Sequence, residues 1–196
     1  MMKTLIILAV LLGMGLSRSY GEEIITFGPK DTKIVGTIAY AVIGQYRAQF
    51  SAFKGRIIFD EESHRIQSVY LEIQANSIKS NSPWCDKIVR SRRLLFTSRY
   101  PKIIFKSDKI ILDESGPKVQ GVLEMKRIKR RFIFPFKMGI MMDQKTKGKW
   151  LDLKGHWTIN RRYFNIVWNR YLDRGGVLVG NYFTVTWWAH VHLNSM

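Results

Sequence analysis

The chain has 196 residues, of which 46% are hydrophobic and 13% aromatic, and its formal charge at pH 7 is +17. This length suits one domain with a substantial core. The single cysteine, Cys85, excludes an intramolecular disulfide, so stability must come from burial, and we expect a buried or half-buried thiol. The basicity points to nucleic acid, to an anionic membrane surface, or to a ligand with an anionic head.

Residues 1–21 have the pattern of a secretory signal peptide. A short positive start precedes an apolar run from Thr4 to Leu16, and Ser19 and Gly21 lie three and one residues before a cleavage point ahead of Glu22. The run is too short to span a bilayer comfortably. No cysteine follows it, which argues against a lipid-anchored lipoprotein.

Cleavage there would leave a mature domain of residues 22–196 in the periplasm or outside the cell. It removes Lys3 and Arg18, so the formal charge falls from +17 to +15. Export argues against nucleic acid as a routine partner. An anionic membrane surface stays open as a partner, and the sequence does not address the oligomeric state.

Strand patterns occupy most of the mature chain. They cover residues 34–43, 46–50, 55–59, 68–75, 100–111, 119–125, 131–140, 149–160 and 181–193. The alternation is clear where Val69, Leu71 and Ile73 share one face. Many antiparallel strands with short turns predict an all-β sandwich or closed barrel, and a barrel of about eight strands can enclose one small ligand.

Residues 82–98 break the alternation and predict one short, irregular helix. Ser82 supplies an N-cap, Pro83 suits the first turn, and Asp86 favours the N-terminal end. Apolar residues then recur at helical spacing from Ile88 to Leu95.

Several segments, taken together, resemble the YceI-like family of lipid- or polyisoprenoid-binding proteins. They are SIKS from Ser77, RYPKIIFKS from Arg99, GVLEMKR from Gly121 and TINRRYFNI from Thr158. The resemblance covers almost all of the mature chain. It implies a lipocalin-like antiparallel β-barrel with one short helix, exported to the periplasm, that encloses an isoprenoid or another long-chain amphiphile. It implies neither catalytic activity nor a cofactor.

The inward positions of the predicted strands form the candidate ligand-binding set. These residues are Ile38, Tyr40, Phe50, Leu71, Ile73, Phe105, Leu123, Phe132, Phe134, Phe136, Trp157, Ile159, Val185 and Trp187. From the residues alone, rings that fill the barrel completely are an equal alternative, and the resemblance favours a cavity. The rival function is a basic surface module with a solid core and no ligand, which docks on an anionic membrane or polymer.

A basic hairpin is the candidate site for a ligand's head group. Lys126, Lys129 and Arg130 lie at the turn after Gly121, where they could bind a phosphate. A solubilising turn, or a patch that holds the protein near anionic lipid, stays open as an alternative. For Arg161 we favour a structural role that ties a loop to the barrel.

The chain shows no pattern typical of an enzyme or a metalloprotein. His190 and His192 share a strand face, but no carboxylate or cysteine lies at a spacing that would complete a metal site. A nucleophile elbow, paired catalytic carboxylates and a phosphate-binding glycine loop are missing from the sequence. We therefore predict a binding protein that uses no metal and no cofactor.

Overall fold

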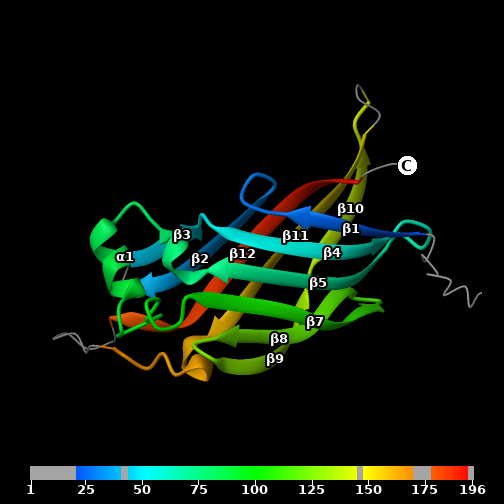
Figure 1. Ribbon diagram of the computed structural model, residues 1–196. Helices are drawn as coiled ribbons and strands as arrows, with labels where there is room; N and C mark the ends of the chain where they lie inside the picture. Colours follow the sequence, from blue (N-terminus) through cyan, green and yellow to red (C-terminus); the bar gives the residue numbers. More distant parts are fainter. Residues whose placement is uncertain (1–20, 41–43, 145–147, 170–177, 194–196) are drawn as a thin grey trace, which may run out of the picture.

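The computed structural model of the chain describes residues 21–40, 44–144, 148–169 and 178–193 (Figure 1). All of the predicted signal peptide except Gly21 lies outside them. The strands are β1 (Glu22–Phe27), β2 (Thr32–Tyr40), β3 (Gly44–Phe50), β4 (Phe53–Asp60), β5 (Arg65–Gln74), β6 (Ile78–Lys79), β7 (Lys102–Asp113), β8 (Gly116–Met125), β9 (Ile128–Pro135), β10 (Lys137–Met142), β11 (Lys149–Asn160) and β12 (Val179–Leu193). The helices are α1 (Pro83–Arg90) and two short 3-10 helices, η1 (Ala75–Ser77) and η2 (Arg161–Phe164).

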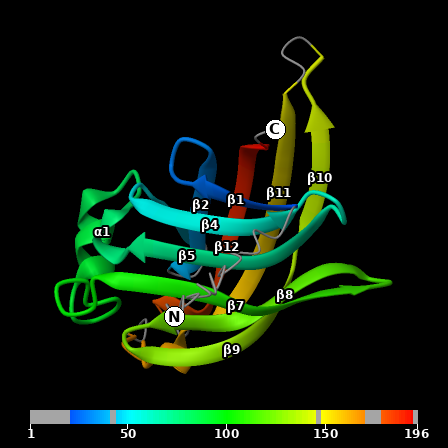
Figure 2. The ribbon, with the colours of Figure 1, turned by 45° about the vertical axis from the view of Figure 1, so that its right-hand side comes forward.

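The strands form two antiparallel sheets that enclose an apolar interior. One sheet has the order β1-β4-β5-β7-β8-β9 and the other β10-β11-β12-β2-β3-β6. The two sheets cross over each other, and the hairpin of β10 and β11 extends beyond the body of the molecule (Figure 2). The all-β class with one short helix is confirmed, in a barrel-like arrangement.

The expectation of about eight strands in one closed barrel needs correction at a proline. The predicted strand at residues 131–140 is two strands in different sheets, β9 and β10, which are separated by Phe136. Pro135 ends β9 because it has no N–H to donate to a continuing ladder. The N–H of Phe136 still donates to the carbonyl of Pro117 at 3.0 Å. This hydrogen bond ties the chain to β8 of the first sheet at the point where it passes to the second sheet. Together with β1 and β6, which the sequence analysis did not predict, the described residues form twelve strands in two sheets that are not joined to each other.

Side-chain direction along the strands follows the predicted period of two. On β9, Phe134 is 5% exposed and its neighbour Ile133 is 54% exposed. On β11, Leu151, Leu153 and Ile159 are buried among outward polar residues. Inward apolar residues of both sheets therefore form one continuous core.

The helix is shorter than predicted and begins where the sequence places it. The Ser82 hydroxyl accepts a hydrogen bond from the Cys85 N–H at 3.4 Å, which caps α1. The helix ends at Arg90 because the Ser91 hydroxyl donates to the carbonyl of Ile88 at 2.7 Å. Cys85 is a half-buried free thiol, as expected. Of the helices in the described residues, none has the length and apolar character needed to cross a membrane.

A buried carboxylate fastens α1 to the second sheet. Asp86 is 4% exposed and accepts hydrogen bonds from the Tyr46 hydroxyl at 2.8 Å and from the Ser80 N–H at 3.1 Å. Burial by itself would raise the pKa of Asp86, but the bonds from Ser80 and Tyr46 outweigh it and lower the pKa. Burial and the bond to Asp86 raise the pKa of Tyr46. The helix is thus held against β3 and β6 at one end of the molecule (Figure 1).

Candidate ligand-binding cavity

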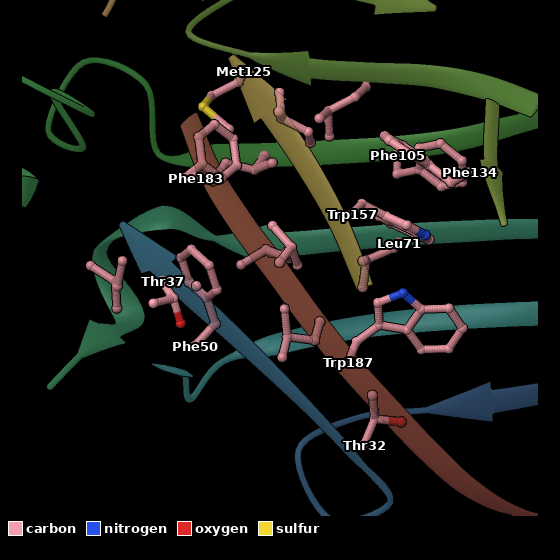
Figure 3. Close-up of a pocket in the computed structure, with 18 of the residues that line it drawn as sticks. Thr32, Thr37, Phe50, Leu71, Phe105, Met125, Phe134, Trp157, Phe183 and Trp187 are labelled. Atoms are coloured by element: carbon pink, nitrogen blue, oxygen red, sulfur yellow. The ribbon is translucent and has the colours of Figure 1, made fainter. Parts of the chain in front are cut away.

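The interior between the sheets is hollow. It contains a cavity of about 230 Å³, with walls formed by both sheets, by α1 and by the turn that follows α1 (Figure 3). Its lining is mainly apolar side chains, with Thr32, Thr37, Tyr46 and Arg161 among the residues that border it. The Thr32 hydroxyl and the Trp187 indole N–H are buried and form no hydrogen bond among the described residues, so a ligand could meet these two polar groups. The rest of the lining favours hydrocarbon, because a polar group buried without a partner is costly. The cavity argues against the alternative of a solid, completely filled core.

The structure brings together nearly all of the side chains in the predicted ligand-binding set. The following line the cavity: Ile38, Phe50, Leu71, Ile73, Phe105, Leu123, Phe134, Phe136, Trp157, Ile159, Val185 and Trp187. Two do not. Tyr40 lines a neighbouring pocket, and Phe132 packs outside the cavity wall. Contact of these residues with a ligand stays a prediction.

Four aromatic rings form one side of the cavity. The rings of Phe134 and Trp157 stack with centroids 4.1 Å apart, and Phe105 and Trp187 lie 6.1 Å and 5.5 Å from the Trp157 ring. Trp157 satisfies its indole N–H outside the cavity, by donating to the carbonyl of Pro135 at 2.9 Å. The Trp187 indole N–H, by contrast, is buried and forms no hydrogen bond among the described residues, so this wall is aromatic with one unpaired donor.

Phe132 leaves the cavity wall because η2 covers its end of β9. Its ring stacks on Phe134 at 5.1 Å and lies 6.2 Å from Phe164, the last residue of η2. Phe164 itself is fully buried. Alternation along β9 gives the correct face for Phe132, but it carries no information about the short helix that fills this part of the interior.

The cavity also includes residues that the sequence analysis did not select. Phe183 lies two residues before Val185 on β12, so an extension of the same alternation would have found it. Phe27 comes from β1, which was not predicted. Val89 and Leu94 reach the cavity from α1 and the turn after it. Whether helix residues reach the cavity depends on where α1 packs against the sheets. The alternation of residues along the strands gives no information about this.

Two glycines of the second sheet leave room for other groups on its inner face. A Cβ atom built on Gly155 would lie 2.9 Å from the Trp187 Nε1 atom, so the bare backbone at this position makes room for the indole. A Cβ built on Gly36 would meet nothing within 4 Å, although Gly36 lines the cavity. A side chain at position 36 could therefore extend into the cavity without a clash.

A buried arginine ties the end of β12 to the segment after η2. Arg161 is 2% exposed, and its guanidinium donates to the carbonyls of Gly180 at 2.8 Å, Ile166 at 2.7 Å, Trp168 at 2.8 Å and Val179 at 3.3 Å. Burial and the nearby charge of Arg162 lower the pKa of Arg161. The structural role predicted for this residue is confirmed.

A second pocket, of about 150 Å³, lies beside the cavity at the end that carries α1. Some residues border both spaces, namely Ile38, Tyr46, Val89, Leu94 and Val179. Trp84 also lines the second pocket and is 62% exposed, so this pocket reaches the surface. The cavity thus approaches solvent through the α1 end of the barrel.

The three cations proposed to bind a head group do not converge on one point. Lys129 faces Glu124 across the hairpin with an ion-pair distance of 3.8 Å, and Lys126 donates to the carbonyl of Asn165 at 3.1 Å. Arg130 follows Lys129 on β9 and therefore points to the opposite face of the strand. Recognition of a head group by these residues stays a prediction.

The histidines take part in a contact on the outer face of the second sheet. The His190 ring stacks on Trp150 with centroids 4.3 Å apart, and its Nδ1 atom hydrogen-bonds to the Asp152 carboxylate. His192 contacts the same indole edge-on at 4.9 Å. No cluster of three or more histidine, cysteine or acidic residues suited to a metal ion occurs in the described ranges.

Comparison with known proteins identifies the family. A family model described as the YceI-like domain matches residues 26–190. The chain belongs to the YceI-like family. Over 117 residues it is 26% identical to Protein YceI of Escherichia coli O17:K52:H18, a match that covers 60% of this chain and 61% of that protein.

Solved structures show the same fold at low sequence identity. BcnA of Burkholderia cenocepacia superposes on this YceI-like protein with a TM-score of 0.65 and 17% identity, over 83% of this chain and 96% of BcnA. A polyisoprenoid-binding domain of Saccharophagus degradans, implicated in plant cell wall breakdown, gives a TM-score of 0.61 and 8% identity, over 87% and 98% of the two chains. The chain thus shares its barrel-like fold with these two proteins.

Proposed function

We propose that this YceI-like protein binds a long apolar chain, of the polyisoprenoid class, inside its cavity and carries or sequesters it. The cavity between the sheets is the observation that carries this proposal, because apolar side chains form most of its lining. Each methylene buried there contributes about 0.8 kcal/mol. The likeness to a polyisoprenoid-binding domain supports the ligand class.

The proposed mechanism is binding without a chemical step. A reactive ester or phosphate inside the cavity would meet mainly carbon atoms, and the Thr32 hydroxyl and the Trp187 N–H, which have no hydrogen-bond partner among the described residues, are not paired with a base. Hydrolysis needs a positioned nucleophile or base within hydrogen-bond reach of the reacting group. Reversible enclosure of the chain is what this arrangement can perform.

Mass spectrometry of an organic extract of the purified native protein tests the proposal. We expect a stoichiometric isoprenoid or related chain that stays bound at high salt, because enclosure in an apolar cavity is not screened by ions. A lipid that washes off as the salt concentration rises, from a protein that takes up no isoprenoid, would support the rival surface-binding module instead.

Placing a large side chain in the cavity at Gly36 should weaken uptake without unfolding the protein. The Cβ of Gly36→Leu would project into open space on the inner face of β2, and Gly36 has no left-handed backbone angle that would strain a side chain. We expect a several-fold weaker uptake of a fluorescent isoprenoid at an unchanged or higher melting temperature. Gly139→Leu is the matched control, since a Cβ there also meets nothing within 4 Å but lies on the exposed side of β10. Equal uptake by the two variants would show that the chain does not occupy this cavity.

We also propose that the protein works outside the cytoplasm after its signal peptide has been cleaved. The first strand begins at Glu22, directly after the predicted cleavage point, so cleavage there would leave the described fold intact. N-terminal sequencing of the protein from its native host should give a start at or within a few residues of Glu22. Recovery of a cytoplasmic form that keeps Met1 would contradict this localisation.

A further inference from the structure

We propose that the end of the barrel that carries α1 docks on an anionic lipid bilayer. This end, named the mouth end here, comprises α1, the turn after it, the β8–β9 turn at Lys126 and Arg127, and residues 161–169. The inference rests on the proposed function, since a chain held in an apolar cavity must come from a lipid phase and return to one.

Side-chain contacts hold the parts of the mouth end together. The guanidinium of Arg93, after α1, lies 5.4 Å from the ring centroid of Trp168. The Lys126 ammonium on the β8–β9 turn donates to the carbonyl of Asn165 at 3.1 Å. Arg93 and Trp168 also line the pocket that borders the cavity. This end is thus one surface, and it lies where the cavity approaches solvent. Figure 1 shows α1 and the β8–β9 turn at the same end of the molecule.

Large apolar and aromatic side chains are exposed on this surface. Trp84 in the first turn of α1 is 62% exposed, Tyr163 on η2 is 52% exposed and Val167 is 57% exposed. Tyr182, which pairs with Asn160 next to η2, is 61% exposed. Tryptophan and tyrosine favour the boundary between lipid and water because each combines an apolar ring with a polar tip.

Cations surround these aromatic side chains. Within the described part of the chain, the following basic residues of the mouth end form no ion pair: Lys87, Arg92, Arg93, Lys126, Arg127 and Arg162. One acidic residue close to them, Asp86, is buried and hydrogen-bonded to Tyr46 and Ser80. Another, Glu124, faces Lys129. Basic side chains close to a membrane surface are attracted by anionic lipid.

Two turns at the opposite end of the barrel are rich in acidic residues. The β7–β8 turn there carries Asp113 and Glu114, and the β4–β5 turn carries Asp60, Glu61 and Glu62. These turns lie together because β5 and β7 are antiparallel neighbours. The β8–β9 turn belongs to the mouth end because it is at the other end of β8. An anionic surface would therefore attract the mouth end and repel the opposite end.

Vesicle co-sedimentation of the exported chain tests the proposal. The vesicles contain phosphatidylcholine alone or phosphatidylcholine mixed with phosphatidylglycerol. We expect partition onto the anionic vesicles that weakens with salt, and a loss of about tenfold or more in the triple variant Lys87→Gln, Arg92→Gln, Arg127→Gln. The matched control removes three charges from the outer strand faces instead, with Lys106→Gln, Lys109→Gln and Lys154→Gln. An equal loss in both triple variants would overturn the proposal, because the net charge would then explain the binding.

A second pair of variants tests the aromatic contribution. Trp84→Ser with Val167→Ser should weaken partition several-fold, while Leu112→Ser with Ile133→Ser, which removes apolar groups exposed elsewhere, should not. The Gly36→Leu variant separates the two proposals, since it should still bind vesicles although its cavity is filled. Wild-type protein that carries extracted lipid but binds no anionic vesicle would overturn docking while the proposed function stands, and it would point to a protein partner at this end.

Discussion

Replacing Phe134 by glutamate should abolish ligand uptake and strongly destabilise the barrel, whereas the same change at Ile133 should alter neither property much. Phe134 is 5% exposed in the cavity wall, and Ile133, the next residue of β9, is 54% exposed on the outer face. Loss of a buried aromatic ring costs about 3–5 kcal/mol, and an unpaired buried carboxylate adds several kcal/mol. Thermal melts and uptake of a fluorescent isoprenoid measure the two effects.

A milder substitution at the same position keeps this prediction informative if the charged variant does not fold. Phe134→Leu retains an apolar side chain but removes the ring that stacks on Trp157 at 4.1 Å. We expect a folded protein with a lower melting temperature and weaker uptake. Equal effects of glutamate at positions 133 and 134 would mean that the face of β9 is assigned wrongly.

The sequence predicted the faces of the strands well because burial imposes the period of two directly. Wherever one side of a strand meets the interior, alternate residues must be apolar, as at Leu71 and Ile73 on β5 and at Val185 and Trp187 on β12. Most of the cavity wall could therefore be derived before the structure was known.

The errors arise where long-range packing decides the structure. Pro135 indicates from the sequence that a strand could end there. That the chain then passes to the other sheet depends on β11 being available to pair with β10, which the sequence does not show. Phe132 is displaced from the cavity wall by η2, a helix of four residues without a periodic signal. The hollow interior itself depends on how well side chains from separate strands fill space together, which no local pattern encodes.

The basic hairpin shows a similar limit for surface chemistry. The sequence places Lys126, Lys129 and Arg130 close together, but the strand pleat separates the last two onto opposite faces of β9. Their neighbours also differ, since Glu124 faces Lys129 and the carbonyl of Asn165 accepts from Lys126. Basic residues that are close together in the sequence therefore need not point toward one common site in the fold.

Removal of Arg161 should destabilise the protein more than any surface substitution. In Arg161→Met, the carbonyls of Gly180, Ile166 and Trp168 lose this donor, whereas that of Val179 keeps the hydrogen bond from the Asn169 side chain at 2.8 Å. An unsatisfied buried carbonyl costs about 1–3 kcal/mol. We expect a loss of at least about 3 kcal/mol in urea unfolding, after allowance for relaxation and bound water. Arg161→Lys should recover only part of it, because one ammonium cannot reach four carbonyls in the fixed planar geometry of guanidinium.

Arg162 provides the control for this prediction, because it is the adjacent residue of η2 and its side chain is exposed. Arg162→Met removes the same charge and should change stability by less than about 0.5 kcal/mol. Arg161 also borders the cavity beside Val179 and Ile166, so its loss should loosen the wall near the mouth end and speed the release of bound lipid. If Arg161→Met and Arg162→Met unfold at the same urea concentration, the carbonyl cluster does not hold the segment after η2 to β12, and another contact must do so.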